Sequence, residues 1–170
     1  QTAVSLAAAG ETRFEILCRA ARHFEKGHPE RAAELVFRVA SLAARGALEH
    51  YDDETAVRLS TQAIDSATRG GLVVHASVYR VVAEAHLRLG AVDRSITAFE
   101  RALATTSQRE ERAELLGRIA WAHQVDAEPE KAWTSLSAAF RALGHKLPAE
   151  DLASAASTTS TCHRETCRRQ

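Results

Sequence analysis

The sequence predicts an all-α protein, and three observations lead to this class. Alanine, the residue with the highest helix propensity, occurs 34 times among 170 residues, whereas glycine and proline together occur 11 times. Apolar residues recur at steps of three and four, as in Ile16, Ala20 and Phe24, which places them on one face of a helix. No segment alternates strictly between apolar and polar residues, so the sequence predicts no strand.

Turn-like residues divide the chain at even intervals. They lie near positions 28, 52, 70, 90, 106, 128 and 146, and each segment between them has the length of a helix. We therefore expect seven helices, over residues 11–26, 29–50, 53–69, 72–89, 92–105, 109–125 and 129–143, and a short eighth helix after Pro148.

Residues at the ends of these segments agree with helix starts and stops. Pro29 and Pro129 suit the first turn of a helix, where the N–H group that proline lacks is not needed. Asp52 precedes the third helix, whose dipole favours a carboxylate at that end. Gly71 and Gly90 can end helices in the left-handed conformation.

Small residues recur with one internal spacing. Three sets have steps of 12 and 7 residues, and their first members are 39 and 37 residues apart. A step of 12 crosses a turn between two helices, and a step of 7 is two turns along the second helix. Small side chains at these positions let two antiparallel helices approach closely. The sets are Ala44, Ala56, Ala63; Ala83, Ser95, Ala102; and Ala120, Ala132, Ala139.

This spacing resembles the tetratricopeptide repeat. The best unit is Val78–Leu103, where Tyr79, Val82, Ala83, His86, Leu89, Gly90, Ser95, Phe99 and Ala102 match the motif's aromatic, aliphatic, small and glycine positions. Ala127 replaces the turn glycine in the following unit, and the period near 38 exceeds the usual repeat length of about 34, so the repeats are divergent.

The resemblance implies a domain organisation. Residues 29–147 would form about three antiparallel helical hairpins, stacked as a right-handed α-solenoid. Residues 1–28 would be a lead-in and first helix. Residues 148–170 would be a short helix and a disordered tail rich in serine and threonine.

A second resemblance concerns a longer parent protein. The segments Arg22–Leu35 and Ala139–Pro148 are similar to those that flank helical repeats in large bacterial signalling ATPases and transcriptional regulators. Such proteins join a regulatory ATPase, a repeat region and an output domain, which is a kinase, a cyclase or a DNA-binding domain. Methionine is absent even at position 1, so we expect the chain to begin inside such a protein.

Composition and charge argue against several classes. The chain carries 22 basic and 22 acidic residues, whereas binding to nucleic acid requires a basic face. It has no run of about 18 apolar residues, so we expect no membrane span. Three cysteines are too few for a disulfide framework, and we expect a reducing location, the cytoplasm.

No motif indicates catalysis, a cofactor or a metal. Cys162, His163 and Cys167 are one ligand short of a structural zinc site. His86 and His123 occupy the same position in neighbouring units, which is typical of packing between helices. The acidic clusters at 52–54 and 110–111 lie at helix starts, where the dipole explains them. We expect no enzyme, no cofactor and no metal; an enzyme without a recognisable motif is an alternative.

The repeat resemblance also implies where a partner binds. In that family the first helix of each hairpin contacts a peptide in a concave groove. The matching positions here are Arg38, Ser41, Arg45, Glu49, Arg80, Glu84, Arg88, Glu114, Gly117, Trp121 and Gln124. Arginines there could hold carboxylates of an acidic or C-terminal peptide in bidentate pairs. The alternative for Arg80, Glu84 and Arg88 is a solvated ladder of pairs four residues apart.

Trp121 is the strongest single candidate because tryptophan is enriched among binding anchors; packing between repeats is its alternative. Trp133, on the second helix of the same unit, is expected in the core. The predicted function is a non-enzymatic interaction module that binds a protein segment or another domain of the same chain. The alternative is a structural spacer that orients flanking domains.

Overall fold

The computed structural model describes residues 13–26 and 33–145. Within these ranges all regular secondary structure is helical, which confirms the all-α class. The helices are α2 (Arg13–Lys26), α3 (Ala33–Glu49), α4 (Asp53–Gly70), α5 (Ala76–Arg88), α6 (Val92–Thr105), α7 (Arg109–Val125) and α8 (Pro129–Ala142). The expected eighth helix after Pro148, the tail and the cluster of Cys162, His163 and Cys167 lie outside the described residues.

The predicted helix starts at residues 11 and 29 lie outside the described residues; the other bounds agree with the prediction to within one residue, except at the start of α5. The sequence predicted a helix from residue 72, but residues 72–75 are not helical and α5 begins at Ala76. Gly71 ends α4 at a φ of 63°, and the N–H of Leu72 donates to the carbonyl of Ala67 at 2.8 Å. The β-branched Val73 and Val74 then favour extended backbone.

The same turn ends five described helices: two of these turns are at Gly71 and Gly144, and the other three recur at one spacing. Tyr51, Gly90 and Ala127 all have positive φ, at 60°, 76° and 58°. The residue after each donates its N–H, at 2.9 Å, to the carbonyl five residues earlier, as in a Schellman helix ending. The three positions are 39 and 37 residues apart, which is the spacing of the small-residue sets.

All nine residues of the small-residue sets are buried, from 0% exposed at Ala56 and Ala83 to 8% at Ala132. The sequence prediction that these positions are packed is therefore confirmed. Larger apolar residues complete the core beside them. Phe99, Leu115 and Ile119 join α6 to α7, and Leu59 belongs to a cluster that joins α3, α4 and α5.

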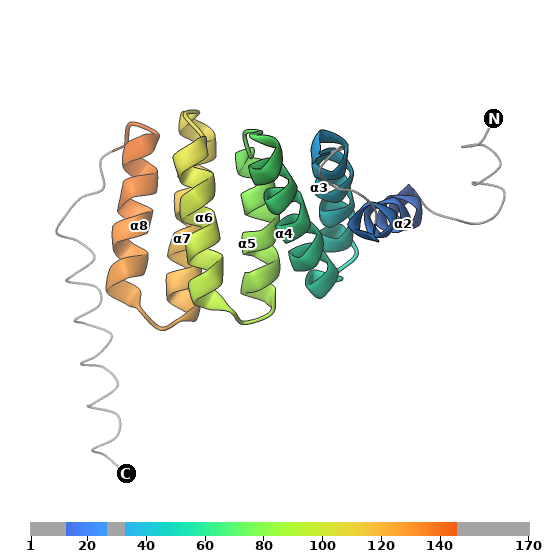
Figure 1. The fold of residues 1–170 in the computed structure, drawn as a ribbon. Coiled ribbons are helices and arrows are strands. Elements are labelled where there is room, and N and C mark those ends of the chain that lie inside the picture. The colour runs from blue at the N-terminus through green and yellow to red at the C-terminus, as the bar shows by residue number, and fades with distance from the viewer. Residues whose placement is uncertain (1–12, 27–32, 146–170) are drawn as a thin grey trace, which may run out of the picture.

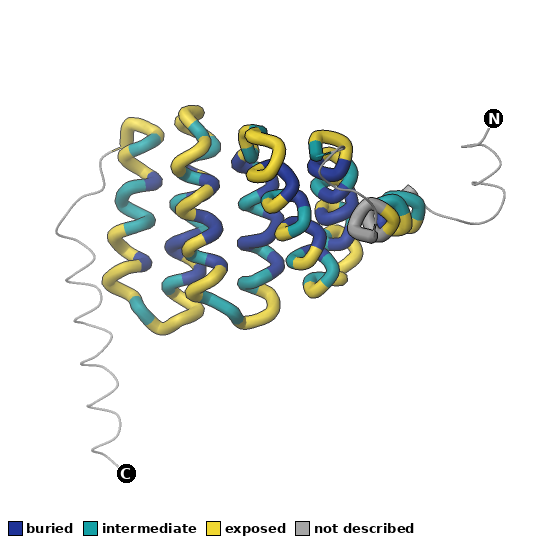
Figure 2. The backbone as a smooth tube through the Cα atoms, in the orientation of Figure 1, coloured by how far each residue is buried: buried dark blue, intermediate teal, exposed yellow. Residues whose placement is uncertain are grey.

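Each helix packs mainly against the helices before and after it in the sequence, and α3 also touches α5. Figure 1 shows the result as a row that runs from α2 to α8 in chain order. Buried residues lie where neighbouring helices face each other, and exposed residues gather at the turns (Figure 2). No described helix is long and apolar enough to cross a membrane.

Candidate partner-binding groove

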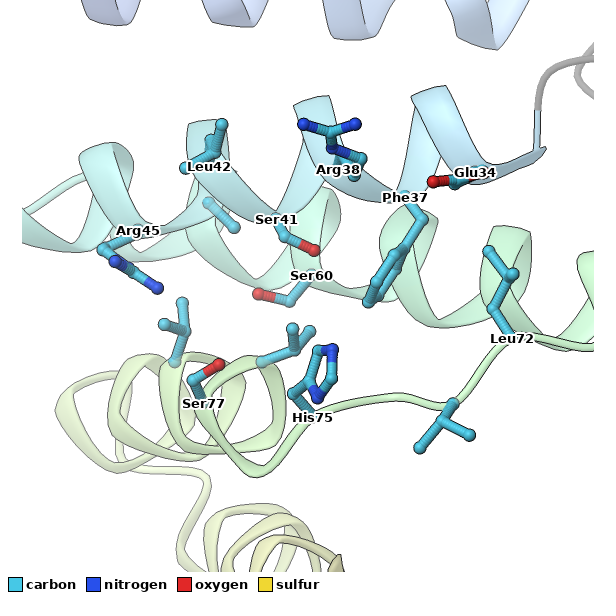
Figure 3. A pocket seen from close by; sticks show the side chains of 14 residues that line it. Glu34, Phe37, Arg38, Ser41, Leu42, Arg45, Ser60, Leu72, His75 and Ser77 are labelled. Atoms are coloured by element: carbon cyan, nitrogen blue, oxygen red, sulfur yellow. The ribbon is translucent and has the colours of Figure 1, made fainter.

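A cavity of about 620 Å³ lies between α3 and α5. Its walls are α3 on one side and, on the other, α5 with the extended residues before it, while Ser60 of α4 lies between them (Figure 3). Apolar side chains form much of the lining: Phe37, Leu42, Leu72, Val73, Val78 and Val81. We call this cavity the α3–α5 groove.

Positive charge dominates the groove. Arg38 and Arg45, seven residues apart on α3, both line it, and Glu34 is the one carboxylate among its lining residues. Both arginines are exposed. Neither guanidinium has an ion pair or a hydrogen bond within the described part of the chain. In Figure 3 the guanidinium of Arg45 is directed toward α5. The guanidinium of Arg38 points away from α5 in the same view, so Arg45 is the cation that faces the groove and Arg38 lies at its edge.

Two serine hydroxyls lie in the groove without partners. The Oγ atoms of Ser41 and Ser60 are buried, and neither makes a hydrogen bond to any described residue. A buried polar atom without a partner has an energetic cost of about 1–3 kcal/mol.

The neighbouring positions on α5 are engaged differently. Arg80 of α5 donates to Glu114 of α7 at 2.9 Å, and Glu84 of α5 forms an ion pair with Arg118 of α7. The charges of Arg80 and Glu84 are thus paired between helices and not along α5. Such pairs connect α5 to α7 across the face of the two helices.

Arg88 is held on the other side of α5. Its guanidinium donates to the carbonyl of Leu48 at 2.9 Å and to Asp53 at 3.3 Å. It also lies 4.9 Å from the centre of the Tyr51 ring, within the range of a cation–π contact. Arg88 therefore connects α5 to the turn between α3 and α4.

The remaining candidates from the sequence lie at helix ends or outside the groove. Glu49 and Gln124 are exposed near the ends of α3 and α7. Trp121 is 57% exposed on α7, so its indole is accessible to a partner. The expectation for Trp133 was wrong, because its side chain is 37% exposed on α8 and lies outside the core.

Sequence reasoning missed several residues of the groove. Phe37 lies in apolar spacing typical of a core residue, and it is buried, but one side of its ring faces the cavity. His75 packs near this ring, with centroids 6.4 Å apart. His75 reaches the groove because residues 72–75 are extended and not helical. The glycine pair 70–71 and the two valines that follow it could have predicted this interruption.

A second, smaller cavity of about 380 Å³ lies over α5 between α4 and α6. His86 lines it together with Tyr79 and Arg94. Burial, and secondarily the charge of Arg94, lower the pKa of His86 below its ordinary value. The imidazole is therefore held neutral, as a packing residue requires.

The acidic cluster at 52–54 acts at a helix end. Asp52 accepts a hydrogen bond from the backbone N–H of Thr55 at 3.2 Å and caps α4, as its position predicted. Among the described residues no group of three His, Cys, Asp or Glu side chains is placed to hold a metal ion.

No protein-family model matches this chain, and no curated protein matches it with significance.

Proposed function

We propose that this chain is a non-enzymatic interaction module that binds an acidic peptide segment in the α3–α5 groove. The observation that carries the proposal is Arg45, which lines the cavity, is directed across it and has no carboxylate partner among the described residues; Arg38, also without such a partner, lies at the edge of the cavity. Guanidinium groups form bidentate pairs with carboxylates. The apolar wall around Phe37 suits apolar side chains beside those carboxylates.

The proposal includes a fold in which the helices form tetratricopeptide-like repeats. Three features support it: the buried small residues, the turn that recurs at residues 51, 90 and 127, and the packing of each helix on its sequence neighbours. We propose stacked hairpins that form a right-handed solenoid, in which the groove is formed by the first helices of two hairpins. The parent would be a cytoplasmic signalling regulator, and the bound segment could come from another of its domains.

The test is a selection of random peptides displayed on phage against the immobilised full chain. We expect selected peptides to be enriched in aspartate and glutamate next to an apolar residue. Arg45→Ala should raise the Kd of a selected peptide about tenfold, since a charge-assisted pair contributes about 1.5–3 kcal/mol. Arg109→Ala, at an exposed arginine of α7 outside the groove, is the control.

Two results would count against the proposal. One is the absence of any acidic enrichment. The other is equal binding by the Arg45→Ala and Arg109→Ala variants. Trp121→Ala extends the test to α7: a weaker complex with an unchanged melting curve would include Trp121 in the binding surface, because the indole is exposed.

A spacer that orients flanking domains is the second candidate. The ion pairs of Arg80 and Glu84 with α7 favour it, because they tie neighbouring first helices into a stiff unit. The spacer would be favoured if the chain selects no peptide from the library and its helices remain rigidly packed.

A further inference from the structure

The α3–α5 groove carries charges of opposite sign at its two ends. Glu34, in the first turn of α3, lines one end, and Arg45, eleven positions later on the same helix, lines the other (Figure 3). Both side chains are exposed, and neither has an ion pair within the described part of the chain. Because an α-helix rises 1.5 Å per residue, the two positions lie about 16 Å apart along α3.

The Glu34 end of the groove also has an apolar wall. Phe37 and Leu72 lie at this end in Figure 3, and Val73, which also lines the cavity, is 75% exposed. A ligand that matches the whole groove therefore has a cation and an apolar side chain at one end. It has a carboxylate about 16 Å away at the other end, which is the distance set by the helix rise.

One segment of this chain carries these groups in the required order. Residues 146–152 begin with Lys146 and Leu147, and their acidic pair ends five positions later at Asp151. Extended backbone advances about 3.3 Å per residue, so these five steps span about 16 Å. In a helix they would span only about 7.5 Å. The segment therefore matches the groove when it is extended, which is the backbone that Pro148 favours for the residue before it.

The segment cannot reach the groove of its own chain. α8 packs on α7, and Figure 1 places α8 at one end of the row, with α4 to α7 between it and α3. Lys146 directly follows His145, the last described residue, so their Cα atoms are about 3.8 Å apart. Lys146 therefore cannot lie beside Glu34 at the start of α3. A second copy of the chain has no such restriction.

We propose that residues 146–152 of a second copy occupy the α3–α5 groove in extended form, with Lys146 at Glu34 and Asp151 at Arg45. The leucine after Lys146 then packs on the apolar wall at the same end. This inference rests on the proposed function, because it names the acidic peptide that the groove binds. The groove and the segment lie at different places on each copy, so the contact is heterologous and can link copies head to tail.

The first test is a titration of labelled peptides with the full chain, followed by fluorescence anisotropy. The chain carries Glu150→Gln and Asp151→Asn, so that its own segment does not compete. A peptide of residues 146–154 should bind, and Arg45→Ala in the chain should raise its Kd about tenfold. Arg109→Ala, outside the groove, should leave the Kd unchanged.

A peptide with the same residues in reverse order is the matched control for the peptide. It has the same composition as the 146–154 peptide but the opposite order of charges. If the groove reads that order, the reversed peptide should bind about tenfold more weakly, since its charges meet like charges at both ends of the groove.

Self-association of the full chain gives a second readout. Sedimentation velocity of the wild type, from low micromolar to several hundred micromolar, should show association that grows with concentration. Glu150→Gln with Asp151→Asn should shift the chain to monomer, whereas Glu165→Gln, which removes a carboxylate outside the segment, should not. The buffer is reducing, so that Cys162 and Cys167 form no disulfides between copies.

Failure of this inference can be told apart from failure of the proposed function. If peptides selected on phage bind and the 146–154 peptide does not, the proposed function stands and the inference is wrong. If neither binds, both are wrong. Equal binding of the forward and reversed peptides, a wild-type chain that stays monomeric, or association that persists in the doubly substituted chain would each overturn the inference.

Discussion

The junctions α3–α5 and α5–α7 each join two helices that are separated by one helix in the sequence, but they differ at the positions that face each other. On α5, Arg80 lies three residues before the buried Ala83 and Glu84 one residue after it, and both meet opposite charges on α7. The same positions on α3, counted from Ala44, are Ser41 and Arg45. One junction is thus closed by two ion pairs, and the other contains a cavity.

The facing helix explains the difference. Glu114 and Arg118 lie six and two residues before Ala120 on α7. The residues at those distances before Ala83 on α5 are Ser77 and Val81, and both line the groove. Glu84 of α5 has a charged partner on α7, Arg118. Arg45 stands at the corresponding position of α3, but Val81 stands on α5 where Arg118 stands on α7, so Arg45 has no charged partner there. The comparison teaches that a junction between two helices can be bridged by ion pairs or left as a cavity, depending on the residues that face each other.

The largest expected effect is a loss of stability, which reports how tightly the side chains are packed at each junction. Phe99→Ala should lower the free energy of unfolding by about 3–5 kcal/mol, because Phe99 is 0% exposed in the cluster that joins α6 to α7. Phe37→Ala should cost clearly less, because Phe37 borders the groove and leaves a smaller new cavity. Urea denaturation measures both, and equal losses would contradict the difference in packing.

An intermediate effect tests the turn that the hairpins share. Gly90→Ala should destabilise the chain by about 1 kcal/mol, because a Cβ is unfavourable at positive φ. Ala127→Gly should raise stability by a similar amount, because it relieves the same conformation at the corresponding turn. Thermal melting of the two variants should show shifts of opposite sign. Shifts of the same sign would mean that the turns are not equivalent.

The smallest expected effect adds a carboxylate to the open junction. Ser77→Glu places a carboxylate in the groove that Arg45 also lines, at the position that Glu114 has on α7. We expect a gain in stability of at most about 1 kcal/mol, as for exposed ion pairs, together with loss of binding to an acidic peptide. The measurements are a melting curve and a titration with a selected peptide. Ser77→Gln is the control, because it fills similar space without charge, and it should keep most of the binding.

Periodic features of the chain could be predicted from the sequence. The helix bounds, the nine buried small positions and the cap at Asp52 follow from spacing and local chemistry. The extended residues before α5 were missed because apolar spacing alone does not distinguish a helix start from two valines after a glycine pair. Trp133 was misplaced because its burial depends on a helix that would cover α8.

The candidate site could be predicted only in part. The repeat resemblance pointed to Arg38, Ser41 and Arg45 on α3, and all three line the groove. The engagement of Arg80 by Glu114, 34 residues later, is a tertiary contact without a local signal. Which arginines are paired and which are available therefore had to come from the structure.

Packing between sequence neighbours has a consequence for how the chain folds. Each helix finds its main partners within a few tens of residues along the chain, so little loop entropy is lost before a contact forms. Proteins with such local contacts fold on timescales of microseconds to milliseconds. Any hairpin could serve as the nucleus, with structure spreading outward from it, and the end helices would be the first to open again.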